Sequence, residues 1–451
     1  MAQAPTGIQV RRTSLIVRGL LGASVLAVVA VGFSGCKNPN RPGRYRPPAE
    51  SQAAAIRTPP PPAPTRVATA PTRAATAPAR TTTAASAARP GPPPRRATAD
   101  AGPVRLVDAE TAKQLGMRAG WQQRIPTRGS GGIKRIVLAD DDVVVIDRMN
   151  AMTVFGASSG ELLWHEAPIP SRERLMGVAR FYLENEDLFL VTTDTDLYLI
   201  GSDTGVQVGR QNLEQVPATE SIKVGEYIVY GTARGRMVWH NVPVGFELKA
   251  NGLESRIAGL PAQLGNRTGA TSVEGRVGVF DSTTAKRVWT KQLNAGFKHG
   301  PALGDGALFC ADNGQRVLCF DSETGSQLWK YFSQTPLTGS PVPLGDRIVQ
   351  EAGDGGMLCL ASEPGNSPQG RLLWQNPNVR GEVVTVLGDD ILVWNEDTRR
   401  LSRIDSTNGT IRLEVRLDNV DHVQAAVDNA GRKVLLVSNR NGRVQRLDPR
   451  N

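Results

Sequence analysis

The chain has 451 residues, with 31 prolines, 47 glycines, 4 cysteines and a formal net charge of +10. Four cysteines, none of them in a Cys-x-x-Cys pair, exclude a disulfide scaffold and a cysteine-held zinc site. Aromatic side chains make up 5% of the residues, which is too few for a surface that stacks single-stranded nucleic acid. An excess of positive charge often indicates a polyanionic partner, so its location along the chain decides what it means.

The positive charge lies in the first quarter of the chain. Residues 1–104 contain fourteen lysines and arginines and two acids, Glu50 and Asp100, which gives a net charge of +12. Residues 105–451 contain 39 basic and 41 acidic side chains, a net charge of −2. The composition therefore disfavours a basic nucleic-acid-binding domain, and the charge belongs to the segments that precede the fold.

The first 35 residues have the pattern of a secretory signal peptide. Three arginines precede the apolar run 20–31, and the sequence Phe-Ser-Gly stands directly before Cys36. This resembles a bacterial lipobox, which implies that residues 1–35 are removed and that Cys36 carries two or three acyl chains. The alternative is an uncleaved transmembrane helix, for which the apolar run is short. The pair Arg11-Arg12 leaves open whether export follows the general secretory or the twin-arginine route.

Residues 36–104 are predicted to form a disordered tether. Proline runs at 59–62 and 92–94 alternate with Ala/Thr stretches that carry an arginine every six to nine residues. Such a segment has too few large apolar side chains to build a core. At about 3.1 Å per residue, a Pro-rich chain of this length reaches up to roughly 200 Å. The alternative role is that its arginines bind an anionic surface, such as lipid headgroups or cell-wall polymer.

Residues 105–451 consist of repeats. Each repeat has two strands joined by a tight turn and an outer strand after a small or acidic turn. An apolar strand that usually ends in Gly-Asp or Gly-Glu precedes them. The recognisable stretches are 142–164, 187–209, 226–248, 263–289, 307–329, 346–374, 389–414 and a shortened 432–448. Four strands in about 43 residues is the length of a propeller blade. We predict an all-β fold, an eight-bladed β-propeller.

The eighth repeat lacks its outer strand, and the segment 117–125 can supply it. This segment carries Trp121, which precedes Trp164 by 43 residues, the length of one blade. We therefore expect the segment to complete the last blade and to close the ring, which removes two free sheet edges.

The turn before the outer strand carries a motif. The best copy, 319–329, matches the Ala-x-Asp-x-x-Thr-Gly-x-x-x-Trp docking motif of propellers related to the pyrroloquinoline-quinone (PQQ) enzymes. We expect the aspartate to cap the turn, the glycine to adopt a positive φ and the tryptophan to pack across the joint between blades. The docking residues predicted in this way are Asp281, Trp289, Asp321, Thr324, Gly325, Trp329, Trp164, Trp374 and Trp121.

A lipobox, a tether and an eight-bladed propeller of this type together resemble the BamB family, the lipoprotein subunits of the outer membrane β-barrel assembly machinery. The resemblance implies a scaffold without cofactor or enzymatic activity, anchored to the periplasmic side of the outer membrane, with envelope proteins as partners. Lys37, where the bacterial sorting rule would place an aspartate for the inner membrane, favours the outer membrane. No local motif identifies partner-binding residues, so the sequence assigns none.

Two other functions remain as alternatives. A PQQ-dependent dehydrogenase would need a quinone, a cation held by carboxylate and amide ligands and a catalytic aspartate. Its family usually has a disulfide between adjacent cysteines, whereas Cys310, Cys319 and Cys359 are separated, and we find no matching constellation. The second alternative is a generic binding or sensing module of the envelope. The sequence leaves open whether Cys310 and Cys319 pair and whether the central channel holds a ligand.

Overall fold

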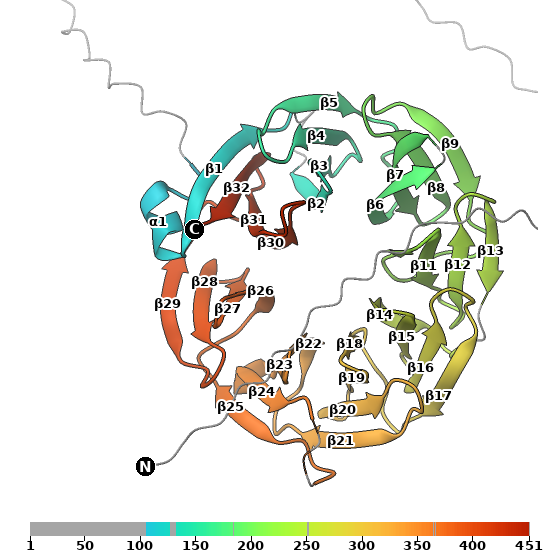
Figure 1. The fold of residues 1–451 in the computed structure, drawn as a ribbon, viewed down its shortest axis with the longest axis vertical. Helices are drawn as coiled ribbons and strands as arrows, with labels where there is room; N and C mark the ends of the chain where they lie inside the picture. The colour runs from blue at the N-terminus through green and yellow to red at the C-terminus, as the bar shows by residue number, and fades with distance from the viewer. Residues whose placement is uncertain are drawn as a thin grey trace, which may run out of the picture. The chain divides into compact units, whose positions relative to one another are not determined.

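The computed structural model describes residues 105–126, 132–183, 185–249, 252–363, 365 and 367–450. Within these residues the chain forms one short helix, one 3-10 turn and 32 strands in eight four-stranded antiparallel sheets. The sheets follow one another around a ring (Figure 1). The prediction of an eight-bladed all-β propeller is confirmed. The predicted signal peptide, Cys36 and the tether lie outside the described residues.

The blades are numbered in chain order, and each runs from an inner strand at the channel to an outer strand at the rim. Blades 1 to 4 are β2 (Ile133–Ala139), β3 (Asp142–Asp147), β4 (Met152–Gly156), β5 (Leu162–Glu166); β6 (Leu175–Leu183), β7 (Glu186–Thr193), β8 (Asp196–Gly201), β9 (Gln207–Asn212); β10 (Ile222–Val224), β11 (Tyr227–Gly231), β12 (Met237–Asn241), β13 (Phe246–Lys249); and β14 (Ile257–Leu264), β15 (Arg267–Ser272), β16 (Arg276–Asp281), β17 (Arg287–Gln292).

Blades 5 to 8 continue in the same order, except that the outer strand of blade 8 comes from the beginning of the chain. They are β18 (Ala302–Gly304), β19 (Ala307–Ala311), β20 (Arg316–Asp321), β21 (Gln327–Phe332); β22 (Thr338–Leu344), β23 (Arg347–Glu351), η1 (Gly353–Gly355), β24 (Met357–Ala361), β25 (Leu372–Asn376); β26 (Glu382–Leu387), β27 (Asp390–Asn395), β28 (Arg400–Asp405), β29 (Ile411–Arg416); and β30 (His422–Val427), β31 (Lys433–Ser438), β32 (Arg443–Pro449), β1 (Met117–Arg124).

The sequence pattern of each strand follows from its place in the blade. The second and third strands are covered on both faces by neighbouring blades, so they are continuous apolar runs, such as β3 and β8, in which every residue is buried. The outer strands are covered on one face only, so exposed and less exposed residues alternate along them, as in β9. The hydrophobic core is therefore divided into eight clusters that lie mainly between adjacent blades.

The ring closes as predicted, because β1 pairs with β32. The register is antiparallel, from Met117 opposite Pro449 to Arg124 opposite Arg443, with an irregularity between Ala119 and Gln122. Blade 8 thus joins the two ends of the described chain in one sheet. Because β1 supplies its fourth strand, β32 has no free edge.

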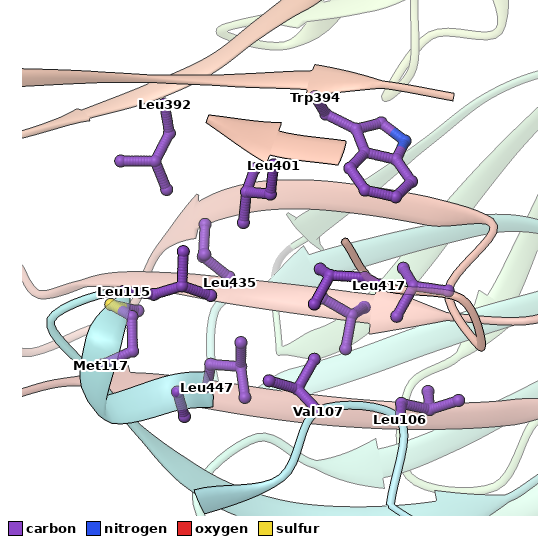
Figure 2. Close-up of a cluster of buried hydrophobic side chains, with 13 residues drawn as sticks. Leu106, Val107, Leu115, Met117, Leu392, Trp394, Leu401, Leu417, Leu435 and Leu447 are labelled. Atoms are coloured by element: carbon purple, nitrogen blue, oxygen red, sulfur yellow. The ribbon is translucent and has the colours of Figure 1, made fainter. Parts of the chain in front are cut away.

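The residues just before β1 form a second part of this closure, which we call the clasp (residues 105–116). It contains α1 (Ala109–Gln114), whose first turn is capped by Asp108. The backbone N–H of Val107 donates to the side-chain oxygen of Gln445 at 2.8 Å, and the amide nitrogen of Gln445 donates to the Val107 carbonyl at 2.9 Å. The clasp also packs on the largest buried cluster of the ring (Figure 2), which consists of Leu106, Val107, Ala112, Leu115, Met117, Leu392, Trp394, Leu401, Leu417, Val420, Leu435, Val437 and Leu447.

Candidate functional site

The docking motif forms a tight turn held by one carboxylate. Asp321 accepts hydrogen bonds from the backbone N–H of Thr324 at 2.7 Å and from its hydroxyl at 2.8 Å, and these bonds lower the pKa of Asp321. Asp281 holds Thr284 in the same way, and its pKa is lowered for the same reason. An ionised aspartate is therefore the form that fits the turn.

The tryptophan of each motif lies over the turn of the next blade. Gly325 has φ +71°, and a Cβ atom there would lie 2.6 Å from the ring of Trp289, so the turn requires glycine for both its backbone conformation and its contact. The indole N–H then donates to a backbone carbonyl of that next blade. The pairs are Trp121 to Ala157 (2.8 Å), Trp164 to Ser202 (2.7 Å), Trp289 to Ser322 (2.9 Å), Trp329 to Ser362 (2.8 Å) and Trp374 to Ser406 (2.9 Å).

Two further residues make the same kind of bond, and sequence reasoning missed both. Trp239 lies on β12, not on an outer strand, yet its indole N–H donates to the Ser282 carbonyl at 2.9 Å. In blade 5 the tryptophan of the cross-strand pair Cys319–Trp329 lies on the outer strand. In blade 3 the pair is Trp239–Leu248, so the tryptophan lies on the third strand and the smaller side chain on the outer one. At the joint between blades 2 and 3, Gln211 donates to the Val242 carbonyl at 2.8 Å in place of a tryptophan.

The joint between blades 7 and 8 has no docking tryptophan among the described residues. The cross-strand pair at the equivalent place is Arg403 and Leu413. Arg403 forms an ion pair with the buried Asp390 and donates to the Gln114 carbonyl of the clasp at 3.4 Å. The clasp therefore supplies at this joint the contacts that a tryptophan supplies elsewhere.

The cysteines of the propeller are inert packing residues. Cys310, Cys319 and Cys359 are buried and carry free thiols. Burial raises the pKa of Cys319 and of Cys359 to about 12, so neither forms a thiolate at neutral pH. Among the described residues, no group of three or more His, Cys, Asp or Glu side chains is arranged to hold a metal ion.

Three cavities among the described residues lie between blades 6 and 7 and share lining residues, and together we call them the 6–7 groove. Its mouth is a cavity of about 430 Å³ between the β23–β24 loop, the connection from blade 6 to blade 7 and the β27–β28 loop. A second cavity of about 390 Å³ shares Thr338, Glu351, Gly381 and Glu382 with the mouth. A third, of about 550 Å³, shares Val342 and Val383 with the second. The groove therefore follows β22 and β26 from the mouth toward the opposite end of the ring.

The mouth of the 6–7 groove is strongly acidic, although the ring as a whole is close to neutral. Five carboxylates and one guanidinium line it, for a formal charge of −4: Glu351, Asp354, Glu382, Glu396, Asp397 and Arg380. Two hydrogen bonds hold Glu351 in place in the mouth. Its carboxylate accepts from the Thr338 hydroxyl and from the Gly381 N–H, both at 2.8 Å. Arg380 pairs with the exposed Asp354 at 3.2 Å.

A second surface feature lies on the outer strands of blades 1 to 3, and we call it the outer apolar patch. Its side chains are between 47% and 70% exposed: Leu162, Leu163, Val206, Val208, Val244 and Phe246. They lie on β5, β9 and β13 and on the turns that lead into β9 and β13, which follow one another around the rim (Figure 1). By contrast, β17 exposes no large apolar side chain, and β21, β25 and β29 expose one each. Exposed apolar side chains on consecutive strands make this rim a candidate interaction surface.

No helix in the described part of the chain is long and apolar enough to cross a membrane.

Comparison with known proteins supports the interpretation of the repeats. The model of the family described as "Outer membrane protein assembly factor BamB" matches residues 100–273, 273–367 and 365–451. The outer membrane protein assembly factor BamB of Burkholderia pseudomallei (strain K96243) is 22% identical over 313 residues, which cover 64% of this chain and 78% of that protein.

Solved structures show the same architecture. BamB from Moraxella catarrhalis has a TM-score of 0.57 and 16% identity, over 74% of this chain and 97% of that chain. The computationally designed protein Ika8 is almost as similar, with a TM-score of 0.56 and 14% identity, over 72% of this chain and 98% of that one. Because a designed ring matches nearly as well, these likenesses show the fold alone. The family match, which runs through the whole propeller, shows more: this chain belongs to the family of outer membrane protein assembly factors BamB.

Proposed function

We propose that this chain is a lipid-anchored, non-enzymatic scaffold of the cell envelope that takes part in the assembly of outer membrane proteins. The observation that supports it most is the family match over residues 100–451. The curated relative is an assembly factor by name, and family membership extends that role to this chain as a proposal. Neither PQQ nor a metal has a part in it.

The outer apolar patch is the surface that we assign to the partner. Apolar side chains on three consecutive outer strands give a protein partner area to bury, and the free edge of an outer strand offers backbone groups for pairing. Val208 on β9 and Phe246 on β13 lie within this patch and are 53% exposed each. A partner that docks here would leave the channel and the 6–7 groove open.

The anchor that we propose is a lipid on Cys36, with residues 37–104 as a leash between the membrane and the propeller. Lys37 favours the outer membrane, and the leash would let the ring search the periplasmic space beside it. If so, Cys36→Ala should release the protein from the membrane fraction of cells. Retention of the variant as an integral membrane protein would instead indicate an uncleaved helix.

The partner surface can be tested by photo-crosslinking in cells. A crosslinking amino acid is placed at Val208 or at Phe246, and the matched control is the exposed Arg287 on β17, the outer strand of blade 4. We expect covalent adducts with an outer membrane β-barrel protein from the two patch positions and none from the control, as identified by mass spectrometry. Absence of any outer membrane protein among the adducts would contradict the assembly role, and equal adducts from all three positions would contradict the patch.

A further inference from the structure

The 6–7 groove has the dimensions of an extended peptide. Its three cavities share residues in sequence, and they follow β26, which has six residues. A strand rises about 3.3 Å per residue, so the groove is about 20 Å long and accommodates six or seven residues of extended chain. The connected cavities therefore fit a linear segment better than a compact small molecule.

The walls of the groove change character along its length. The mouth carries the formal charge of −4, whereas the deeper part has no net charge. It combines apolar side chains with two acidic and two basic ones: Val342, Leu344, Val383 and Val386 with Asp346, Asp389, Arg347 and Lys433. A matching occupant has a basic side chain at one end and apolar or β-branched side chains along the rest. Such an occupant gains charge complementarity at the mouth and buries apolar area below it.

The backbone on the two sides of the groove is not equivalent. Both β22 and β26 are inner strands and lie at the edges of their sheets. On β22, Pro341 and Pro343 have no N–H to donate, whereas β26 contains no proline. The Val386 carbonyl of β26 already accepts from Lys433 at 2.8 Å. An extended occupant can form main-chain hydrogen bonds along the rest of β26, in the manner of strand addition.

One buried side chain at the mouth lacks the partner that its counterparts have. Each of the other six tryptophans donates its indole N–H to a backbone carbonyl of a neighbouring blade. Trp394 lines the mouth and is only 6% exposed, yet its N–H has no acceptor among the described residues. Figure 2 shows its nitrogen on the edge of the ring that faces away from Leu417. The nitrogen is not among the fully buried unpaired atoms of the described residues, so it opens onto the cavity. A ligand acceptor in the cavity, such as a peptide carbonyl, can therefore meet this N–H.

From these observations we infer that the 6–7 groove binds an extended segment of a partner protein, with a lysine or arginine among the carboxylates of the mouth. Glu382 and Glu396, which are both exposed, meet the basic side chain, and Trp394 donates to a backbone carbonyl of the segment. The exposed pair between Arg380 and Asp354 contributes little to stability, so it yields readily to an incoming cation. The site is separate from the outer apolar patch, so its failure would leave the proposed function untouched.

The test is binding of a labelled peptide to the full chain, followed by fluorescence anisotropy. The probe is the nonapeptide RRVTVTVSG, and its matched control is EEVTVTVSG. We expect the basic probe to bind and the acidic one to bind at least about tenfold more weakly, with an affinity that falls as salt rises. Equal affinity for the two peptides, or no binding of the basic probe at millimolar concentration, would overturn the inference.

Variants of the chain locate the binding. The double change Glu382→Lys and Glu396→Lys should weaken the basic probe by about tenfold or more, and Trp394→Phe by about threefold. The matched control is Glu161→Lys with Glu186→Lys, which makes the same charge change at exposed positions in blades 1 and 2. Loss of affinity that is equal in the control and groove variants would show unspecific attraction and would overturn the site.

The chain's own basic segment is the competing occupant. Arg95 and Arg96 stand ten and nine residues before Arg105, where the described structure begins. If they filled the groove, Arg95→Glu with Arg96→Glu would increase the affinity of the full chain for the probe. We expect no increase, and a clear one would assign the groove to this segment instead of a partner.

Discussion

The joint between blades 5 and 6 and the joint between blades 7 and 8 solve the same problem in different ways. The first is made by Trp329, which is fully buried and donates to the Ser362 carbonyl at 2.8 Å. The second has Arg403 and Leu413 at the equivalent pair and is covered by the clasp, which Gln445 holds through two hydrogen bonds to Val107. One joint depends on a single large side chain, and the other on a segment from the far end of the chain.

This difference has a consequence for the order in which the ring opens. Trp329 and Ser362 are 33 residues apart, whereas Val107 and Gln445 are 338 apart. Closing a longer loop costs more conformational entropy, and the clasp is a chain terminus of the propeller, where local opening is easiest. We therefore expect the clasp to open before any tryptophan joint does, so that the propeller opens first between blades 7 and 8.

The largest loss of stability should follow Trp329→Ala. The change removes a fully buried ring from the cluster between blades 5 and 6 and leaves the Ser362 carbonyl without its donor. Substitutions of this kind cost about 3–5 kcal/mol. Denaturant unfolding of the purified chain measures the loss, and Trp329→Phe, which keeps a ring and removes only the N–H, should cost about 1–2 kcal/mol. If both variants unfold with the same midpoint as the parent, the joints do not carry the stability of the ring.

A smaller loss, confined to one joint, should follow Gln445→Ala. Gln445 is fully buried, and without it the N–H and the C=O of Val107 both lose their partners. We expect the free energy of unfolding to fall by about 2–3 kcal/mol. The loss is limited to this size because opening of the clasp lets water bind the unpaired groups of Val107. Hydrogen exchange should show lost protection in residues 105–116 and intact protection at Trp329. The control is Gln424→Ala on β30, an exposed position in the same blade that should change neither quantity.

Much of the architecture could be predicted from the sequence, because each blade repeats a local pattern. The strand and turn order, the number of blades and the pairing of 117–124 with the end of the chain all follow from the spacing of turns and tryptophans. The joints that departed from the motif could not be predicted in the same way. Trp239 acts from the neighbouring strand, and only the cross-strand register with Leu248 makes its position clear.

The clasp and the 6–7 groove could not be predicted from the sequence, for a different reason. Val107 and Gln445 carry no motif, and their contact exists only after the ring has closed. The groove depends on the spacing between β22 and β26 and on carboxylates from two strands and two turns of blades 6 and 7, which converge only in the folded ring. The acidic mouth was hidden by a net charge of −2 for the whole propeller, since a sum over residues carries no positions.

Acid should weaken the joint between blades 8 and 1, where an ionised Asp428 supports the contact that Trp121 also makes. Burial opposes the ionisation of Asp428, but hydrogen bonds from Arg432 and from the buried Arg446 outweigh it and lower the pKa of Asp428 to about 2. The folded pKa lies below the unfolded value of 3.8, so this stabilisation is present above pH 4 and is lost as the pH falls toward 2. Arg446 also donates to the Ala157 carbonyl of blade 1 at 2.9 Å, so protonation of Asp428 loosens that contact.

The measurement is thermal unfolding as a function of pH, compared between the parent chain and Asp428→Asn. The variant should be less stable than the parent at pH 7, and the difference should shrink between pH 4 and pH 2. A difference that stays constant over this range would show that Asp428 does not supply the acid sensitivity.

The smallest expected effect is a gain, and it compares two glycines at docking positions. Gly209 occupies the place where other outer strands carry tryptophan, its φ is not positive, and a Cβ atom there would meet Leu199 at 3.5 Å, an ordinary contact. Gly209→Ala should therefore stabilise the chain by about 0.4–1 kcal/mol, because it restricts the unfolded chain without strain in the folded one. Gly325→Ala should do the opposite, since Gly325 has φ +71° and lies against Trp289. The unfolding midpoints of the two variants, compared with the parent, measure both effects. If Gly209→Ala also loses stability, the prediction is wrong. The space at Gly209 is then needed to fit blade 2 against blade 3, where Gln211 replaces the tryptophan.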